Sequence, residues 1–260
     1  MPLRSVLWLG FFVAILGAWA WLYWMAMGMD LDVIGRPGPA GQAMRMMDPG
    51  MDMYMPMANF WPVFVMWVVM MAAMMLPTLV PTLRSYEDLI ANANGTRAGW
   101  LGVVAGYFVV WVGFAGLIAG AQIFLLHRGV LDMLGIPTSG WIAAGLLAVV
   151  GAYQFTWAKE VCHGVCHSPM MYFLGHWRTG ALGGLRMGAG LGLYCCGCCW
   201  GFMALGFVGG TMSLLWMGLA TLIMVFEKLP QVAHRVTKPV GIALLIGAGI
   251  VAAKTAGILG

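Results

Sequence analysis

All six cysteines of the chain fall into two short clusters. The first is Cys162-His163-Gly164-Val165-Cys166-His167, and the second is Cys195-Cys196-Gly197-Cys198-Cys199. In a helix, Cys162 and Cys166 lie one turn apart on one face, and the second cluster holds four thiols within an arc of about 160°. Thiolate and imidazole ligands at these spacings favour copper(I), or else zinc. The candidate metal ligands are Cys162, His163, Cys166, His167, Cys195, Cys196, Cys198 and Cys199.

The cysteines are also compatible with other chemistry. Covalent haem attachment uses Cys-x-x-Cys-His, whereas three residues separate Cys162 from Cys166, so haem is disfavoured. A disulfide would have to join different helices, because adjacent cysteines on one helix have poor geometry for bridging. Free cysteines can be inert buried residues. Four thiols in five residues nevertheless favour metal or redox chemistry.

Methionine is concentrated between residues 44 and 57, where seven of fourteen residues are methionine. Thioether sulfur is a soft, uncharged ligand that selects copper(I) over harder ions. In an extended chain alternate side chains face the same way, so one face could present the sulfurs of Met51, Met53, Met55 and Met57. The alternative is an interfacial segment, although two prolines and two aspartates argue against a regular amphipathic helix.

A second group of methionines lies in the apolar run that follows. At 3.6 residues per turn, Met66, Met70 and Met74 form a column on one helical face, about 6 Å apart in rise. A soft cation could pass along such a column. Ordinary core packing by flexible side chains is the competing interpretation.

Seven apolar runs predict the helices that must position these sulfurs. The chain is 62% hydrophobic with a mean hydropathy of +0.89, and only 8% of its residues are charged, against about 25% in soluble domains. About 20 apolar residues cross a bilayer core as a helix. We therefore predict an all-α membrane helix bundle of about seven transmembrane helices. The runs are 6–27, 60–82, 100–125, 139–157, 188–208, 211–227 and 239–257.

The basic residues indicate orientation more than a nucleic-acid partner, because they are scattered singly between the runs. Placing the amino terminus inside leaves nine Lys and Arg residues in the cytoplasm and four outside, as the positive-inside rule favours. The expected location is a bacterial cytoplasmic membrane, crossed several times. The chain divides into an anchor helix with an external methionine-rich loop (1–59) and a helix bundle that carries the cysteines (60–260).

We favour one ion shared by the two cysteine clusters over two independent sites. A shared ion requires that the helices carrying the two clusters pack together. The cytoplasmic end of the run at 139–157 must pack against the run at 188–208, for which Gly184, Gly188 and Gly192 offer a small face. A re-entrant segment after Lys159 would bring the clusters to the same depth. The adjacent Glu227 and Lys228 are expected to neutralise each other and anchor their helix at the interface.

Several short motifs occur in one order along the chain: Trp67 to Pro77; Gly151 to Gln154 with Lys159, Cys162, Cys166, Ser168 and Pro169; His176 to Arg178; Gly197 to Trp200 with Met203; and Glu227-Lys228. In these motifs the chain resembles a bacterial family of predicted metal-binding integral membrane proteins of unassigned function. The resemblance covers about residues 60 to 250 and implies a metal site in a membrane bundle. This family usually has Arg before the Ser-Pro, where this chain has His167. The methionine loop lies outside the resemblance and is similar in kind to the external clusters of eukaryotic high-affinity copper transporters.

The resulting hypothesis is a relay in which copper(I) is captured outside by the methionine loop and passes the methionine column to the thiolates. Ligand strength for a soft ion rises along this path, which favours uptake or delivery. One alternative is an accessory subunit that loads copper into a membrane enzyme, and another is a membrane thiol redox protein. No enzyme activity is expected, because no nucleophile with a base is evident. The expected partners are the lipid bilayer, the metal ion and a membrane partner subunit, with no nucleic acid.

Overall fold

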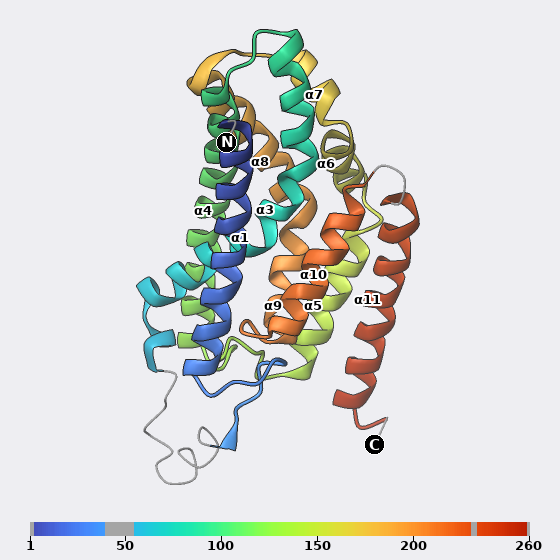
Figure 1. Ribbon diagram of the computed structural model, residues 1–260. Helices are drawn as coiled ribbons and strands as arrows, with labels where there is room; N and C mark the ends of the chain where they lie inside the picture. Colours follow the sequence, from blue (N-terminus) through green and yellow to red (C-terminus); the bar gives the residue numbers. More distant parts are fainter. Residues whose placement is uncertain (1–2, 40–54, 230–232, 259–260) are drawn as a thin grey trace.

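The computed structural model describes residues 3–39, 55–229 and 233–258, and all regular secondary structure in these ranges is helical. This confirms the predicted all-α class. The long helices run back and forth along one direction, and the two chain ends lie toward opposite ends of the molecule (Figure 1). The helices are α1 (Leu3–Gly28), η1 (Met55–Ala58), α3 (Phe60–Asn92), α4 (Arg97–His127), α5 (Gly140–Tyr153), α6 (Trp157–His167), α7 (Pro169–His176), α8 (Gly180–Ala204), α9 (Gly206–Gly209), α10 (Leu214–Glu227) and α11 (Ala233–Thr255).

Five of the described helical segments are long and apolar enough to cross a membrane: α1, α3, α4, α8 continued by α9, and α11. The expected count of about seven is therefore not confirmed. Two of the expected spans are short, since α5 and α10 have 14 residues each. At 1.5 Å per residue each covers about 21 Å, less than the hydrocarbon thickness of about 30 Å. The axis of α5 bends by 62° into α6, so these two helices form a broken span or a re-entrant segment.

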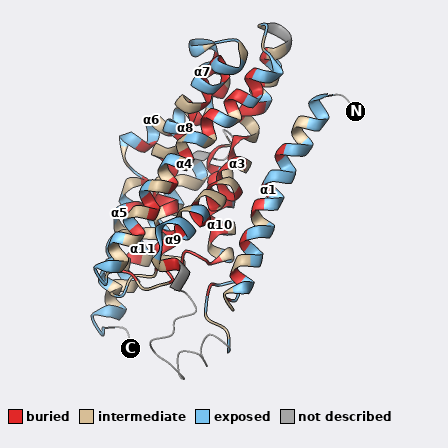
Figure 2. Ribbon diagram, turned by 90° about the vertical axis from the view of Figure 1, so that its left-hand side faces the viewer, coloured by how far each residue is buried: buried red, intermediate tan, exposed pale blue. Residues whose placement is uncertain are grey.

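The helices differ in how much of their surface they bury. In α3 and α8 about three fifths of the apolar window is buried, against about one fifth in α1 and α11. Figure 2 shows α1 standing at the side of the bundle with exposed residues along its length. Beyond Arg4 and Ser5 at its start, its large exposed side chains are mostly apolar, as in Leu16 (68% exposed) and Trp24 (79%). Such a surface suits lipid better than water.

Glycines allow α4 and α8 to pack closely. A Cβ added at Gly102 or Gly106 on α4 would collide with the α8 backbone, and one at Gly184 or Gly188 on α8 would collide with the α4 backbone. The small face of α8 predicted from sequence is thus present. The end of α5 contacts α8 as expected, through Tyr153 and Gly197, but the glycine face itself is turned to α4. The matching glycine row lies on α4, which therefore approaches closest, whereas α5 packs mainly against α11.

The same turn follows both α1 and α4. Residues 31–37 and 131–137 share the pattern Leu-Asp-x-x-Gly-x-Pro, and in each the aspartate Oδ1 accepts hydrogen bonds of 2.7–2.9 Å from two later N–H groups. The glycine has a positive φ in both turns. A carbonyl of the first turn accepts from the Leu215 N–H, and one of the second from the Thr211 hydroxyl. The two turns therefore hold the start of α10 between them.

Pro77 lies inside α3 and frees one backbone acceptor. Proline has no N–H, so the Ala73 carbonyl lacks its usual partner one turn later. The Trp19 indole N–H of α1 donates to this oxygen at 3.1 Å. The break in the ladder of α3 thus ties α1 to the bundle.

Candidate metal centre

Three cysteine sulfurs form a compact group where α6 meets α8. The Sγ atoms of Cys166, Cys195 and Cys198 all lie within 4.8 Å of one another. Cys199 joins them, with its Sγ 3.3 Å from that of Cys198 and 3.9 Å from that of Cys195. All four side chains are buried. We call Cys166, Cys195, Cys198 and Cys199 the thiol site.

Helix geometry explains this grouping. Positions 195, 198 and 199 are related by i, i+3 and i+4, so they share one face of α8. Because the chain bends after α5, α6 lies against α8 and presents Cys166, whose Sγ is 3.9 Å from that of Cys198. Metal–thiolate bonds of about 2.3 Å place the sulfurs of a tetrahedral site about 3.8 Å apart. Two of the observed separations, Cys166–Cys198 and Cys195–Cys199, are 3.9 Å and so close to this value.

Lys228 is the cation of the thiol site. Its Nζ donates to the Cys195 Sγ at 3.0 Å and to the Thr78 Oγ1 at 2.9 Å. The Tyr107 hydroxyl also lies 2.9 Å from the Cys195 Sγ. These residues come from α3, α4 and the end of α10, so three further segments meet α8 around the contact between Lys228 and Cys195. A buried ammonium stabilises nearby negative charge, here that of thiolates.

Glu227 does not pair with Lys228, so the expected neutralising neighbour pair was wrong. Successive residues of a helix point in different directions, and Glu227 faces α6 instead. Its carboxylate accepts two hydrogen bonds of 3.0 Å from Lys159 Nζ, with both side chains almost fully buried. Lys159 also donates to the Gln154 side chain. Glu227 is thereby neutralised, and the charge of Lys228 stays directed at the sulfurs.

The two histidines of α6 lie outside the compact group of sulfurs. Among the described residues the compact group contains cysteines alone. His163 is buried with its ring centroid 4.2 Å from that of His167. The His167 Nε2 lies 2.5 Å from the Glu227 carbonyl oxygen, which joins α6 to the end of α10. Their predicted role as metal ligands stays a prediction.

Cys162 and Cys196 lie at the rim of the thiol site. Both are half-buried, unlike the four thiols inside. The Cys162 Sγ sits against Gly197 on α8, 2.7 Å from the position that a Cβ would take there. Five of the six cysteines thus lie on the facing surfaces of α6 and α8. The sixth, Cys196, lies beside them on α8.

Most of the chain matches a known protein family. The family model PpoB2, described as a copper chaperone, matches residues 64–251. The chain belongs to this copper chaperone family. No curated protein and no solved structure matches it. The match supports the metal-binding part of the family resemblance noted from the sequence motifs, and it specifies copper.

The range shared with the copper chaperone family contains the whole site. It includes the six cysteines as well as Thr78, Tyr107, Lys159, Glu227 and Lys228. It begins after the methionine-rich segment at 44–57, which therefore stands apart from the family match. Sequence reasoning did not place Thr78 or Tyr107 at the site, because an isolated hydroxyl in an apolar run carries no pattern.

The predicted methionine ligands fall into two groups. Met51 and Met53 lie outside the described residues, Met55 begins η1, and Met57 is buried. In α3 the column of Met66, Met70 and Met74 is buried in the core, at 0–2% exposure.

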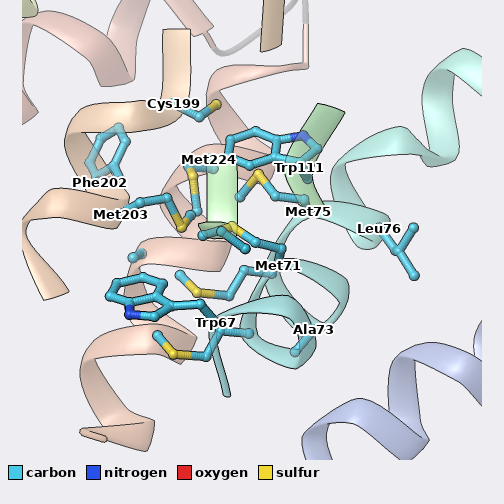
Figure 3. Packing of buried hydrophobic residues seen from close by; sticks show 14 of the residues in the cluster. Trp67, Met71, Ala73, Met75, Leu76, Trp111, Cys199, Phe202, Met203 and Met224 are labelled. Carbon is cyan, nitrogen blue, oxygen red and sulfur yellow. The ribbon is translucent and has the colours of Figure 1, made fainter. Parts of the chain in front are cut away.

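Other buried methionines, not predicted as ligands, lie close to one of the thiols. Figure 3 shows Met71, Met75, Met203 and Met224 grouped between the rings of Trp67 and Trp111, close to Cys199. They come from α3, α8 and α10, so no single run reveals the group. The Met75 carbonyl also accepts a hydrogen bond of 2.7 Å from Thr78, which connects this region to the thiol site.

Proposed function

We propose that the protein is a membrane-embedded chaperone that holds one copper(I) ion at the thiol site and delivers it to a copper-accepting protein. The observation that carries the proposal is the convergence of four buried sulfurs from α6 and α8 beside a buried ammonium. Soft thiolates bind copper(I) strongly. The family description supports copper, and the word chaperone supports delivery.

Charge supports a monovalent cargo. Two thiolates around one copper(I) carry one net negative charge, which the Lys228 ammonium balances. The remaining thiols can stay protonated as close neighbours. A neutral assembly is favoured at this depth, because burial of uncompensated charge costs several kcal/mol.

Metal content of the purified protein tests the proposal. Purified under reducing, anaerobic conditions and supplied with copper(I), the protein should bind one ion per chain. The variant Cys195→Ser should lose the metal, since serine keeps nearly the same size but removes the soft ligand. A protein that carries no copper, yet cycles its thiols between oxidised and reduced forms, would instead be a redox protein.

Uptake is the second candidate function, because buried methionines of α3 extend from the region of Met57 toward the thiol site. Copper accumulation by whole cells separates the two. Deletion of a delivery factor leaves total cell copper unchanged while a copper enzyme loses its metal. Deletion of an uptake protein lowers total copper.

We further propose a location in a bacterial cytoplasmic membrane with the amino terminus inside. Figure 1 supports the opposite placement of the chain ends, with the turn between α3 and α4 on the side of the amino terminus. A reporter fused after Gly260 should be active outside, and one inserted near Asn92 should be active inside. Activity of both on the same side would contradict this topology.

A further inference from the structure

A chaperone must release its ion, yet the thiol site is closed. Cys195, Cys198 and Cys199 are at most 2% exposed, and Cys166 is 8% exposed. An acceptor cannot place a ligand of its own on an ion held only by these sulfurs. Ligand exchange therefore needs a sulfur that reaches both the buried ion and the surface.

Cys162 and Cys196 are the two cysteines placed for this role. Cys162 lies one helical turn before Cys166 on α6, and Cys196 lies next to Cys195 on α8. Both thiols are half-buried, and the Cys162 sulfur sits against Gly197, the residue that follows Cys196. Each of them therefore lies beside a cysteine of the thiol site and is partly open to the surface.

Gly197 brings Cys162 to this position. The glycine stands between Cys196 and Cys198, and its missing side chain leaves room for the Cys162 Sγ against the α8 backbone. The Tyr153 hydroxyl donates to the Gly197 carbonyl at 2.7 Å, which fixes this turn of α8 against the end of α5. Any side chain at position 197 would occupy the space of the Cys162 sulfur.

The outer side of α6 has the character of a water interface. Glu160 is exposed two residues before Cys162, and Trp157 is 77% exposed at the start of the helix. Tryptophan gathers at membrane–water interfaces, and a carboxylate requires water. These two residues place the start of α6 at the depth of the interface, where a soluble ligand can reach the half-buried thiol of Cys162.

We propose that Cys162, assisted by Cys196, is the transfer ligand through which copper(I) leaves or enters the thiol site. This assignment rests on the proposed chaperone function. In the exchange a bond forms between the ion and the Cys162 sulfur, and a bond to Cys166 or Cys198 breaks. Copper stays monovalent, so no oxidant or reductant is needed. The proton lost by the Cys162 thiol balances the one taken up by the released thiolate.

The rate of copper transfer tests this role separately from binding. Full-length protein in detergent is loaded with copper(I), and transfer to the water-soluble chelator bathocuproine disulfonate is followed by absorbance. Cys162→Ser should keep one copper per chain but slow transfer by about tenfold or more. Without the intermediate ligand, the ion must dissociate from the buried sulfurs before the chelator can bind it. Cys196→Ser should slow it less. Cys198→Ser should lose the metal itself.

Gly197→Ala provides an independent test that retains all six thiols. The added methyl group would lie 2.7 Å from the Cys162 sulfur and so displaces it. Transfer should slow while copper content stays the same. Gly164→Ala is the matched control, because a Cβ at this position of α6 has nothing within 4 Å. Its transfer rate should equal that of the unmodified protein.

Failure of this inference looks different from failure of the proposed function. If the unmodified protein binds no copper, the chaperone proposal fails. If Cys162→Ser and Gly197→Ala load fully and transfer at the unmodified rate, Cys162 is not the transfer ligand. If Cys162→Ser loses its copper, Cys162 is a holding ligand, which also overturns the inference.

Discussion

The two sulfur-rich regions of the bundle differ in their surroundings. The thiol site is bordered by an ammonium and two hydroxyls from three further segments. Lys228 and Tyr107 contact the Cys195 sulfur, and Thr78 accepts a hydrogen bond from Lys228. The methionine column of α3 is bordered by buried apolar side chains. Polar groups buried among helices are costly unless they serve a partner. The thiol site is therefore built to hold charge. For the methionine column, core packing is as good an explanation as passage of a metal ion.

The largest effect is expected at the thiols. Replacing Cys195 and Cys198 together with serine should abolish copper binding, because two of four soft ligands are lost. Metal analysis of the reduced protein measures this, and circular dichroism checks that the helices persist. Retention of one copper per chain would show that copper binds at another place. The thiol site would then not differ from the methionine column in holding the metal.

Lys228→Gln should lower copper(I) affinity by about 10- to 100-fold, or about 1.4 to 2.8 kcal/mol. Glutamine can still donate a hydrogen bond but removes the charge that balances the thiolates, and it adds no sulfur. Competition with a copper(I) chelator gives the affinity. Lys254→Gln is the control, since that lysine is exposed at the end of α11. Equal affinities in the two variants would show that the ammonium does not serve the metal.

The methionine-rich loop is expected to act at low copper supply. Replacing Met51, Met53, Met55 and Met57 with leucine keeps apolar bulk and removes the sulfurs. Copper acquisition by cells at limiting supply should fall severalfold, whereas the copper content of purified, fully loaded protein should stay the same. Unchanged acquisition would mean that the loop is not a metal collector.

The smallest effect is expected in the column. Met70→Leu with Met74→Leu should leave copper stoichiometry intact and cost less than about 1.5 kcal/mol of stability per site, as volume-conserving core changes do. Thermal unfolding and metal analysis measure both quantities. A strong loss of copper loading without loss of stability would instead show that these sulfurs lie on the path of the ion.

The thiol site was accessible from sequence because its ligands repeat at helical spacing within short segments. The all-α class followed from composition for a similar reason, since apolar runs signal helices locally. Lys228 could not be assigned in this way. Its separation from Cys195 in the chain is 33 residues, and its neighbour Glu227 offered an apparent partner. Only the packing of α6, which supplies Lys159, shows where each charge is directed.

Helix length and pairing were harder to predict. The apolar runs at 139–157 and 211–227 correspond to helices of 14 residues, because turns at 154–156 and 210–213 interrupt them. The glycine row of α8 was visible, but a row of small residues does not specify its partner. Two helices, α4 and α5, offered glycines, and the closer match of rows on α4 decided the pairing.

The proline in α3 has a consequence for how the anchor helix is registered. The acceptor for the Trp19 indole is a backbone oxygen, so no side-chain substitution at Ala73 can remove it. Pro77→Ala would instead supply an N–H that competes for the same oxygen and completes the turn of α3. This change would make α3 more regular, but it would leave the Trp19 indole without its acceptor. The helix α1 could then shift along the bundle. The register of α1 therefore depends on the N–H group that Pro77 lacks.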